Sequence, residues 1–179
     1  MIVDLGATCW ERDSVPSHMA TIEVGAVRMA SSNDQADREF CSFVRQLQEP
    51  LLSDFCVSLT TITQADVNAA PPFPTVFADF QAWLPDDEFT RCSWGLYDLK
   101  QLRADYRRHR IVFPAVLERH INLKQASANV MNVKPPTTKG ALRLLGLPLS
   151  GTHHRGIDDA RNIARLTGWI LPRLLALVG

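Results

Sequence analysis

Residues 3–11 read Val-Asp-Leu-Gly-Ala-Thr-Cys-Trp-Glu, and this stretch decides how the rest of the chain is interpreted. An apolar run that ends in Asp4 and is followed by bend-prone residues is typical of a strand that brings a carboxylate to the rim of a sheet. A carboxylate in that place is a candidate metal ligand. Because side chains alternate along a strand, residue 6 faces the same way as residue 4. Gly6 therefore stands where a second carboxylate would complete a pair.

The length and composition indicate one intracellular domain, predicted over residues 1–179. Nineteen basic residues balance nineteen acidic ones, so a nucleic-acid or membrane partner has to be argued from a local site. No secretory signal opens the chain, and no apolar run is long enough to span a bilayer. We therefore expect a soluble, cytoplasmic protein without a membrane partner.

The four cysteines are widely scattered and form no Cys-x-x-Cys pair; they are Cys9, Cys41, Cys56 and Cys92. This spacing argues against a zinc site and fits reduced thiols in a cytosol-like compartment. We expect them to act as small, half-buried hydrophobic residues.

The hydrophobic pattern predicts an alternating α/β protein. Strands are expected at residues 1–5, 21–29, 38–44 and 89–94, with the first three as an antiparallel meander. Short helical turns are expected within residues 50–68, and longer helices at residues 76–84, 98–110, 139–145 and 157–171. Thr137 or Thr138 is the expected cap of the helix at 139–145. The aromatic stripe of residues 76–84 is interpreted as core packing.

Acidic residues follow the element boundaries, where side chains converge on a cleft. Asp4 ends the first strand, Asp98 follows Ser-Trp-Gly-Leu-Tyr, and Asp158 and Asp159 begin the last helix a few residues after His154. Mg²⁺ and Mn²⁺ prefer carboxylate oxygens, and two such ions about 3.5 to 4 Å apart stabilise both oxygens of a phosphodiester that is being cleaved. A histidine is suited to take a proton from the attacking water. Alternatively, Asp98 or Asp158 caps its helix.

In its order of motifs, the sequence resembles the DEDDh, or DnaQ-like, 3′-to-5′ exonucleases. Their enhanced-RNAi type branch typically opens with Asp-x-Glu-Ala-Thr-Cys-Trp-Glu, and residues 7–11 keep the last five of these. Further family-like segments are Ile-Glu-Val-Gly-Ala-Val at 22–27, Leu-Ser-x-Phe-Cys at 52–56, Leu-Thr-x-Ile-Thr-Gln-Ala-Asp-Val at 59–67, Ile-Asn-Leu-Lys at 121–124 and the tail around His-His-Arg-Gly-Ile-Asp-Asp at 153–159. The resemblance covers practically the whole chain and implies a ribonuclease H-like mixed sheet flanked by helices.

The resemblance also implies a role for each candidate residue. Asp4 becomes the ligand shared by two Mg²⁺ or Mn²⁺ ions, Asp98 and Asp159 further metal ligands, and His154 the general base. Asp159 fits the family spacing and Asp158 does not. The nucleotide-binding residues implied are Ala7, Thr8, Cys9 and Trp10, although Trp10 is equally well interpreted as a core residue.

Gly6 departs from the family pattern, which has glutamate there. The loss of an anionic ligand is expected to weaken one metal position and to impair activity. Glu11 or Glu23 could replace the missing carboxylate, or water could, and we expect impairment rather than rescue.

Two functions follow. The first is a metal-dependent 3′-to-5′ exonuclease that releases nucleoside monophosphates from the 3′ end of single-stranded RNA, which the resemblance favours, with single-stranded DNA left open. The second is an inactive nuclease fold that binds nucleic-acid 3′ ends. Candidate phosphate contacts are Lys124, Lys139, Arg143 and Arg155. A homodimer is expected through Trp169 to Val178, unless this apolar end packs inside.

Overall fold

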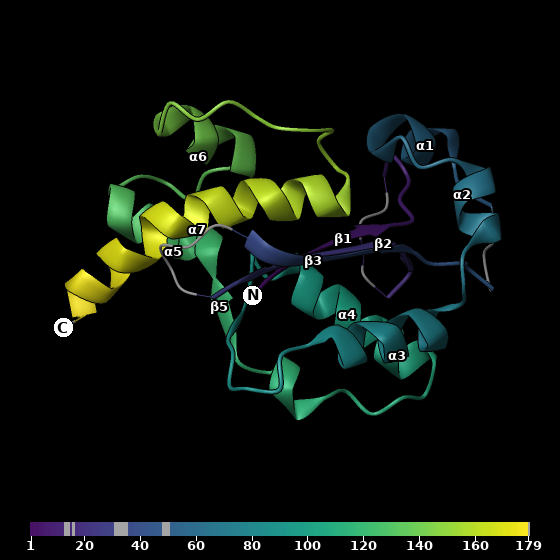
Figure 1. Ribbon diagram of the computed structural model, residues 1–179. Helices are drawn as coiled ribbons and strands as arrows, with labels where there is room; N and C mark the ends of the chain where they lie inside the picture. The colour runs from purple at the N-terminus through teal and green to yellow at the C-terminus, as the bar shows by residue number, and fades with distance from the viewer. Residues whose placement is uncertain (13–14, 16, 31–35, 48–50, 179) are drawn as a thin grey trace.

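The fold is known from a computed structural model, which describes residues 1–12, 15, 17–30, 36–47 and 51–178. Across these residues five strands form one mixed sheet in the order β3-β2-β1-β4-β5 (Figure 1). The strands are β1 (Ile2–Ala7), β2 (Thr21–Met29), β3 (Ala36–Phe43), β4 (Arg91–Ser93) and β5 (His120–Asn122). β1, β2 and β3 are antiparallel, whereas β4 and β5 run parallel to β1. The expected meander and mixed sheet are confirmed.

β1 is longer than predicted, and Asp4 lies in its middle rather than at its end. Pairing with β2 continues past Leu5, because Gly6 lies opposite Glu23 and Ala7 opposite Thr21, with an irregularity between the two pairs. β5 was not predicted, because its sequence, His-Ile-Asn, contains a single apolar residue and shows no alternating pattern.

The helices are α1 (Asp54–Thr60), α2 (Gln64–Ala69), α3 (Phe73–Trp83), α4 (Tyr97–Arg108), α5 (Leu123–Met131), α6 (Thr138–Leu144) and α7 (Gly156–Val178), with a short 3₁₀ turn at Ala115–Leu117. Thr137 caps α6, because its side chain accepts a hydrogen bond from Gly140 N. α5 was not predicted, and α7 continues beyond the expected end despite Pro172. Pro50, the expected start of the helical turns, lies outside the described residues.

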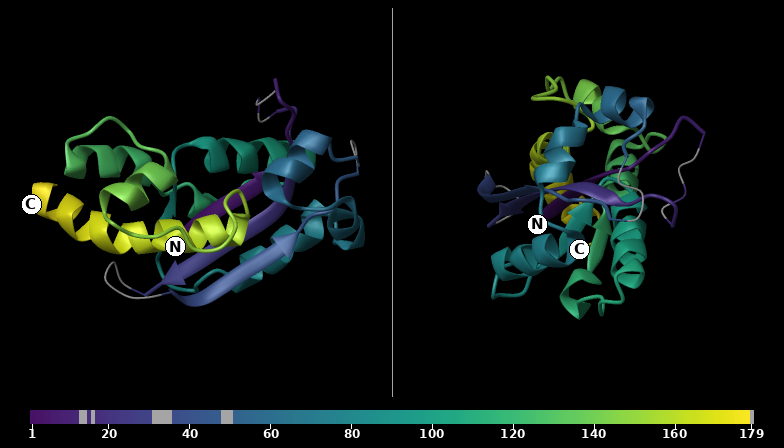
Figure 2. Two further views of the ribbon diagram at one scale, coloured as in Figure 1. Left: turned by 90° about the horizontal axis from the view of Figure 1, so that it is seen from above. Right: turned by 90° about the vertical axis from the view of Figure 1, so that its right-hand side faces the viewer.

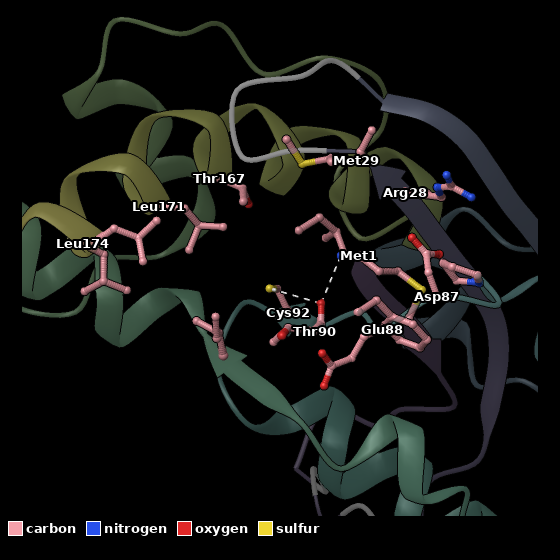
Figure 3. Close-up of a pocket in the computed structure, with 16 residues that line it drawn as sticks. Met1, Arg28, Met29, Asp87, Glu88, Thr90, Cys92, Thr167, Leu171 and Leu174 are labelled. Atoms are coloured by element: carbon pink, nitrogen blue, oxygen red, sulfur yellow. Dashed lines mark hydrogen bonds between the residues drawn. The ribbon is translucent and has the colours of Figure 1, made fainter. Parts of the chain in front are cut away.

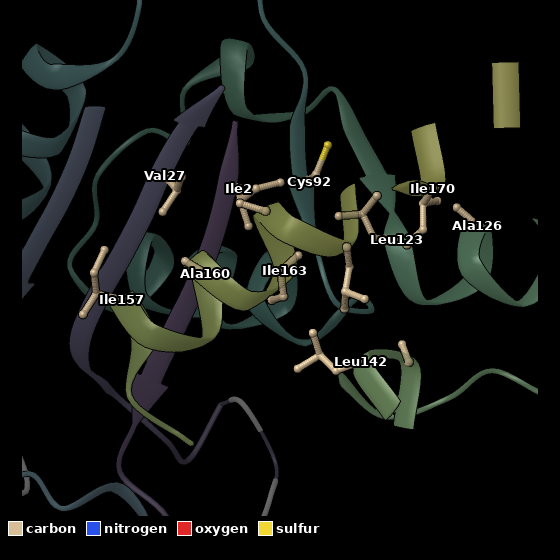
Figure 4. Packing of buried hydrophobic residues seen from close by; sticks show 13 residues of the cluster. Ile2, Val27, Cys92, Leu123, Ala126, Leu142, Ile157, Ala160, Ile163 and Ile170 are labelled. Carbon is tan, nitrogen blue, oxygen red and sulfur yellow. The ribbon is translucent and has the colours of Figure 1, made fainter. Parts of the chain in front are cut away.

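Helices cover both faces of the sheet (Figures 1 and 2). On one face, Ile2 and Val27 pack against α7, α5 and α6, with Ala160 and Ile163 of α7 turned toward the strands (Figure 4). On the other face, apolar residues of β1 and β2 pack against α3 and α4. The aromatic stripe of α3 is core packing, as predicted, since Val76, Phe77 and Phe80 are buried.

A third apolar cluster fixes the segment that follows β1. Cys9 packs with Ile22, Cys56 and Ile62 beneath α1 and α2, and Trp10 lies against this cluster. The Cys9 carbonyl also accepts a hydrogen bond of 2.6 Å from Ser53 Oγ. The Ala-Thr-Cys-Trp segment is therefore held in place by α1. All four cysteines are free thiols, and among the described residues no helix is long and apolar enough to cross a membrane.

Candidate active site

A cavity of about 550 Å³ opens at the end of β1, next to the first turns of α4 and α7. It brings together the four side chains predicted to carry out the chemistry, which are Asp4, Asp98, His154 and Asp159. These residues come from three separate parts of the chain. The fold therefore brings these four side chains to one cavity.

Asp98 joins α4 to β1. It is only 3% exposed, and its carboxylate accepts a hydrogen bond of 3.1 Å from Leu5 N. Burial raises the pKa of Asp98 to about 6, although the Leu5 N–H and the Arg91 charge favour the ionised form. The capping interpretation is incomplete, because the carboxylate binds a neighbouring strand and lines the cavity.

Asp4 lies among like charges. Burial raises the pKa of Asp4 well above its ordinary value, and the carboxylates of Asp98, Asp159 and Glu23 raise it further, in that order. Clustered carboxylates repel one another unless a cation lies between them. The donor set therefore fits a hard, oxygen-preferring divalent ion such as Mg²⁺ or Mn²⁺.

Asp159 is held by two successive histidines. Its Oδ1 lies 2.9 Å from His153 Nδ1, and its Oδ2 accepts a hydrogen bond of 2.9 Å from the backbone N–H of His154. His154 is exposed, with a left-handed φ of 67°. Partial desolvation, the His153 ring and the charge of Lys139 lower the pKa of His154, and the Asp159 carboxylate partly opposes them.

His153 is a site residue that the sequence analysis missed. Its ring, together with the His154 ring and the Asp159 carboxylate, forms a group whose ligand atoms lie within 4.8 Å of one another. The His-His dipeptide was the available signal, but the family spacing selects only the second histidine. Asp158 lies outside this cavity, where it accepts a hydrogen bond of 2.8 Å from Thr152 N and pairs with Arg161.

Two glycines let α7 approach the sheet closely enough to deliver Asp159. Gly25 lies opposite Asp4 in the β1–β2 register, and a Cβ on it would come closer than 3.0 Å to the backbone of Gly156 and Ile157. A Cβ on Gly156 would lie 3.0 Å from the Asp4 carbonyl oxygen. Helix and sheet therefore meet backbone to backbone beside the carboxylates.

Gly6 lies against one of the two carboxylates considered as its replacement. A Cβ at position 6 would lie 3.3 Å from Glu23 Cβ and 3.7 Å from Glu23 Oε2. Glu23 is fully buried and bound to Arg155. Glu11, in contrast, is exposed and lines the cavity.

The residues predicted to contact nucleotides divide into two groups. Ala7, Cys9 and Trp10 line the cavity. Thr8 is buried, and its hydroxyl accepts a hydrogen bond of 2.9 Å from Ala20 N; it is not among the described residues of the lining. Aromatic side chains that the sequence analysis did not single out complete the walls, namely Phe55, Trp94 and Tyr97.

Of the predicted phosphate contacts, only Lys124 lines this cavity. Lys139 and Arg143 line a separate groove of about 420 Å³ beside α6. Arg155 binds Glu23 with its guanidinium. Lys124 is therefore the basic residue placed to meet a phosphate in the cavity.

A second cavity, of about 440 Å³, lies at the opposite end of β1 (Figure 3). Met1, Leu171 and Leu174 give it an apolar wall, and the Thr90 carbonyl accepts hydrogen bonds from the Met1 amino group and from Cys92 Sγ. None of the predicted site residues is among the described residues that line this second cavity. Within the predicted dimer segment, Trp169 to Val178, Ile170 packs inside the protein, whereas Leu175 and Leu177 are exposed. The homodimer itself stays a prediction.

We expect Asp98 to make the stability of the metal-free protein depend on pH. Its folded-state pKa of about 6 lies above the ordinary 3.8, so the protonated carboxyl group stabilises the folded protein. This contribution to stability is complete below pH 3.8 and is lost as the pH rises through 6. Asp98→Asn, which keeps an acceptor for Leu5 N, should unfold like the parent near pH 4. Near pH 7.5 the variant should be more stable by about 2 to 3 kcal/mol. Urea unfolding in EDTA measures the free energy of unfolding of both proteins. A difference between them that stays constant with pH would contradict this account.

Comparison with known proteins gives the same assignment as the motifs. A family profile described as Exonuclease (RNase_T) matches residues 2–167. The chain is 31% identical to ERI1 exoribonuclease 2 of Xenopus laevis, over 93% of this chain and 27% of that protein. It is also 31% identical to 3′-5′ exoribonuclease 1 of Mus musculus, over 92% of this chain and 50% of that protein.

The fold is also similar to that of a solved structure. The nuclease domain of 3′hExo, a DEDDh family member bound to rAMP, superimposes with a TM-score of 0.90 at 29% identity, and the match covers 96% of this chain and 90% of that one. The predicted ribonuclease H-like architecture is confirmed. The chain belongs to this exonuclease family, and it is similar in sequence to ERI1-type exoribonucleases and in fold to the nuclease domain of a DEDDh family member.

Proposed function

We propose that this chain is a metal-dependent 3′-to-5′ exonuclease that releases nucleoside monophosphates from the 3′ end of single-stranded RNA. Single-stranded DNA is a further substrate on this proposal, and residues 1–179 act as one domain. The observation that carries it is the meeting of Asp4, Asp98 and Asp159 with His154 in one cavity. Carboxylates forced together in this way are characteristic of sites that hold divalent cations.

Each residue then has a distinct role. Asp4, Asp98 and Asp159 would hold the metal, and Asp4, as the central carboxylate, would be shared. Two Mg²⁺ or Mn²⁺ ions supply stabilisation of the attacking and leaving oxygens when they are bound. His154 accepts the proton from the attacking water, and its lowered pKa favours the neutral ring that this role needs. His153 holds the Asp159 carboxylate in one orientation.

The cavity walls suit a single-stranded end. Trp10, Trp94 and Tyr97 offer aromatic surface on which unpaired bases stack, and Lys124 offers a positive charge for a phosphate. The preference for RNA is supported by the names of the relatives, which are exoribonucleases. Those relatives are longer than this chain, so the preference is proposed for the domain alone.

Gly6 is proposed to weaken the metal site without removing it. Residue 6 points to the same face of β1 as Asp4 and adjoins the cavity, and glycine offers no oxygen ligand there. The second candidate function is a nuclease fold that binds 3′ ends and does not cleave them, and the same Gly6 favours it. The two candidates differ in whether the remaining carboxylates suffice.

The deciding experiment restores the missing carboxylate. Gly6→Glu is compared with the parent on 3′-labelled and 5′-labelled single-stranded oligoribonucleotides, in Mg²⁺ and in Mn²⁺. Gly6→Gln is the matched control, because it adds the same bulk without the charge, and Asp4→Ala is the blank. The new Cβ needs only a small shift of Glu23, which it approaches to 3.3 Å.

We expect the parent to shorten the oligonucleotide from its 3′ end slowly, and best in Mn²⁺. Gly6→Glu should be faster by about tenfold to 100-fold, whereas Gly6→Gln should not. Cleavage by Gly6→Glu alone would favour the binding function for the native chain. If neither protein cuts under any of these conditions, the exonuclease proposal is wrong.

A further inference from the structure

Glu23 is a fully buried carboxylate with an unusually complete set of partners. Arg155 donates to it from Nε, at 3.3 Å to Oε1 and 3.2 Å to Oε2, and from Nη2, at 3.0 Å to Oε1. The backbone N–H of Gly156 donates to Oε2 at 2.7 Å. Strand β2 and the beginning of α7 are thereby joined at one point.

This contact fixes the first turn of α7. Gly156 is the first residue of the helix, and the Arg155 carbonyl accepts the hydrogen bond of 2.9 Å from Asp159 N. The first N–H groups of a helix have no partner within the helix and favour a nearby negative charge. Glu23 provides both an acceptor and that charge. The amide that it binds, Gly156 N, lies about one turn before Asp159 and two residues after His154.

The same contact stabilises an unfavourable backbone conformation. His154 has φ near 67°, a left-handed value that is unfavourable for a residue other than glycine. Such a conformation persists only where its surroundings enforce it. Asp159 binds His154 N on one side. On the other side, the Arg155 guanidinium is held by Glu23 and lies 5.2 Å from the centre of the Phe43 ring.

Glu23 is badly placed to act as a metal ligand in place of residue 6. Both of its oxygens already accept hydrogen bonds, and its charge is matched by Arg155. It is also not among the described residues that line the cavity. Its position instead determines where the segment carrying His154 and Asp159 lies on the sheet.

We propose that Glu23 is a positioning residue: together with Arg155 it holds His154 and Asp159 in the geometry of the candidate active site, and it does not replace the carboxylate missing at position 6. The proposal rests on the proposed function for its catalytic consequence. The placement of the segment itself is testable without metal or turnover.

The test compares Arg155→Gln, Glu23→Gln and the double variant Glu23→Gln/Arg155→Gln. Arg155→Gln leaves a buried carboxylate without its charge partner, which is the most harmful change. Adding Glu23→Gln removes that stranded charge while keeping an acceptor for Gly156 N, so the double variant should recover part of the loss. Arg161→Gln is the matched control, because Arg161 belongs to the same helix and forms an exposed pair with Glu39 on β3.

The direct readout is amide hydrogen exchange by NMR at His154, Gly156 and Asp159 in EDTA. Arg155→Gln should speed exchange at these amides by about tenfold or more and lower the melting temperature by about 5 °C or more. The double variant should be intermediate between Arg155→Gln and the parent. Arg161→Gln should leave all three amides within about twofold of the parent. Unchanged exchange in Arg155→Gln would overturn the positioning role.

Measuring kcat and KM distinguishes a positioning role of Glu23 from a role as metal ligand. If the parent cleaves too slowly to measure, the same variants are made in the Gly6→Glu protein. Arg155→Gln should lower kcat about tenfold to 100-fold with KM within about twofold, and the double variant should regain part of kcat. A double variant slower than Arg155→Gln would mean that Glu23 acts directly at the metal, and would refute the proposal. The exchange experiment needs no turnover. It therefore tests the positioning role of Glu23 even if the protein proves not to be an exonuclease.

Discussion

Gly25→Ala is expected to destabilise the protein by more than about 3 kcal/mol, since the added methyl group overlaps backbone atoms at the start of α7. Side chains can rotate away from such a contact, but the atoms met here belong to the peptide between Gly156 and Ile157. The helix must therefore move away from β2. That movement would also carry Asp159 away from Asp4 and abolish any activity of the site.

Urea unfolding followed by tryptophan fluorescence measures the loss for Gly25→Ala. Gly140→Ala is the matched control, because it makes the same change in α6, where the nearest neighbour of the new Cβ is a side-chain atom, Thr137 Oγ1, at 3.2 Å. The control should stay within about 1 kcal/mol of the parent. A Gly25→Ala protein as stable as the control would mean that α7 does not approach β2 as closely as described.

Asp4→Asn is expected to stabilise the metal-free protein while lowering exonuclease activity by about 10³-fold or more. Asp4 is half-buried, and its carboxylate is desolvated and lies among three other negative groups, which is why its pKa is raised. An isosteric amide removes that repulsion and should raise stability in EDTA at pH 7.5 by about 1 to 2 kcal/mol. The same amide is a much poorer ligand for a divalent cation.

Thermal unfolding in EDTA and in Mn²⁺ distinguishes the two effects. Mn²⁺ should raise the melting temperature of the parent and not that of Asp4→Asn, because only the parent binds the ion in its folded state. Asp158→Asn is the control, since Asp158 is a nearby acidic residue that lies outside the cavity; its activity should stay within about fivefold of the parent. Equal stabilisation of parent and Asp4→Asn by Mn²⁺ would show that Asp4 is not a ligand.

The elements that the sequence predicted best are those with a long, regular pattern. Residues 21–29 carry β-branched and apolar residues in loose alternation and form β2 with the predicted bounds. The aromatic spacing after Pro72 predicted the buried face of α3 in the same way. β5 and α5 were missed because His120–Asn122 contains a single apolar residue, and because Leu123–Met131 has few large apolar side chains.

The candidate site was predictable to the extent that local motifs carry it. Asp4, Asp98 and Asp159 were named from their motifs, and the fold gathers them. Thr8 was grouped with its neighbours along the chain, whereas pairing with Ala20 directs its hydroxyl elsewhere. The His153 contact with Asp159 and the left-handed backbone at His154 are not evident from residue types.

The sequence by itself determined the family, the order of the carboxylates and the absence of a side chain at position 6, because these follow from residue identity and spacing along the chain. Only the tertiary structure decided which carboxylate lies beside Gly6 and what that carboxylate does. Glu23 is 17 positions away along the chain, yet strand pairing puts it opposite Gly6, and α7 reaches it through Arg155 and Gly156. Strand register and the close approach of a helix depend on packing between distant segments, and neither is specified by a local motif.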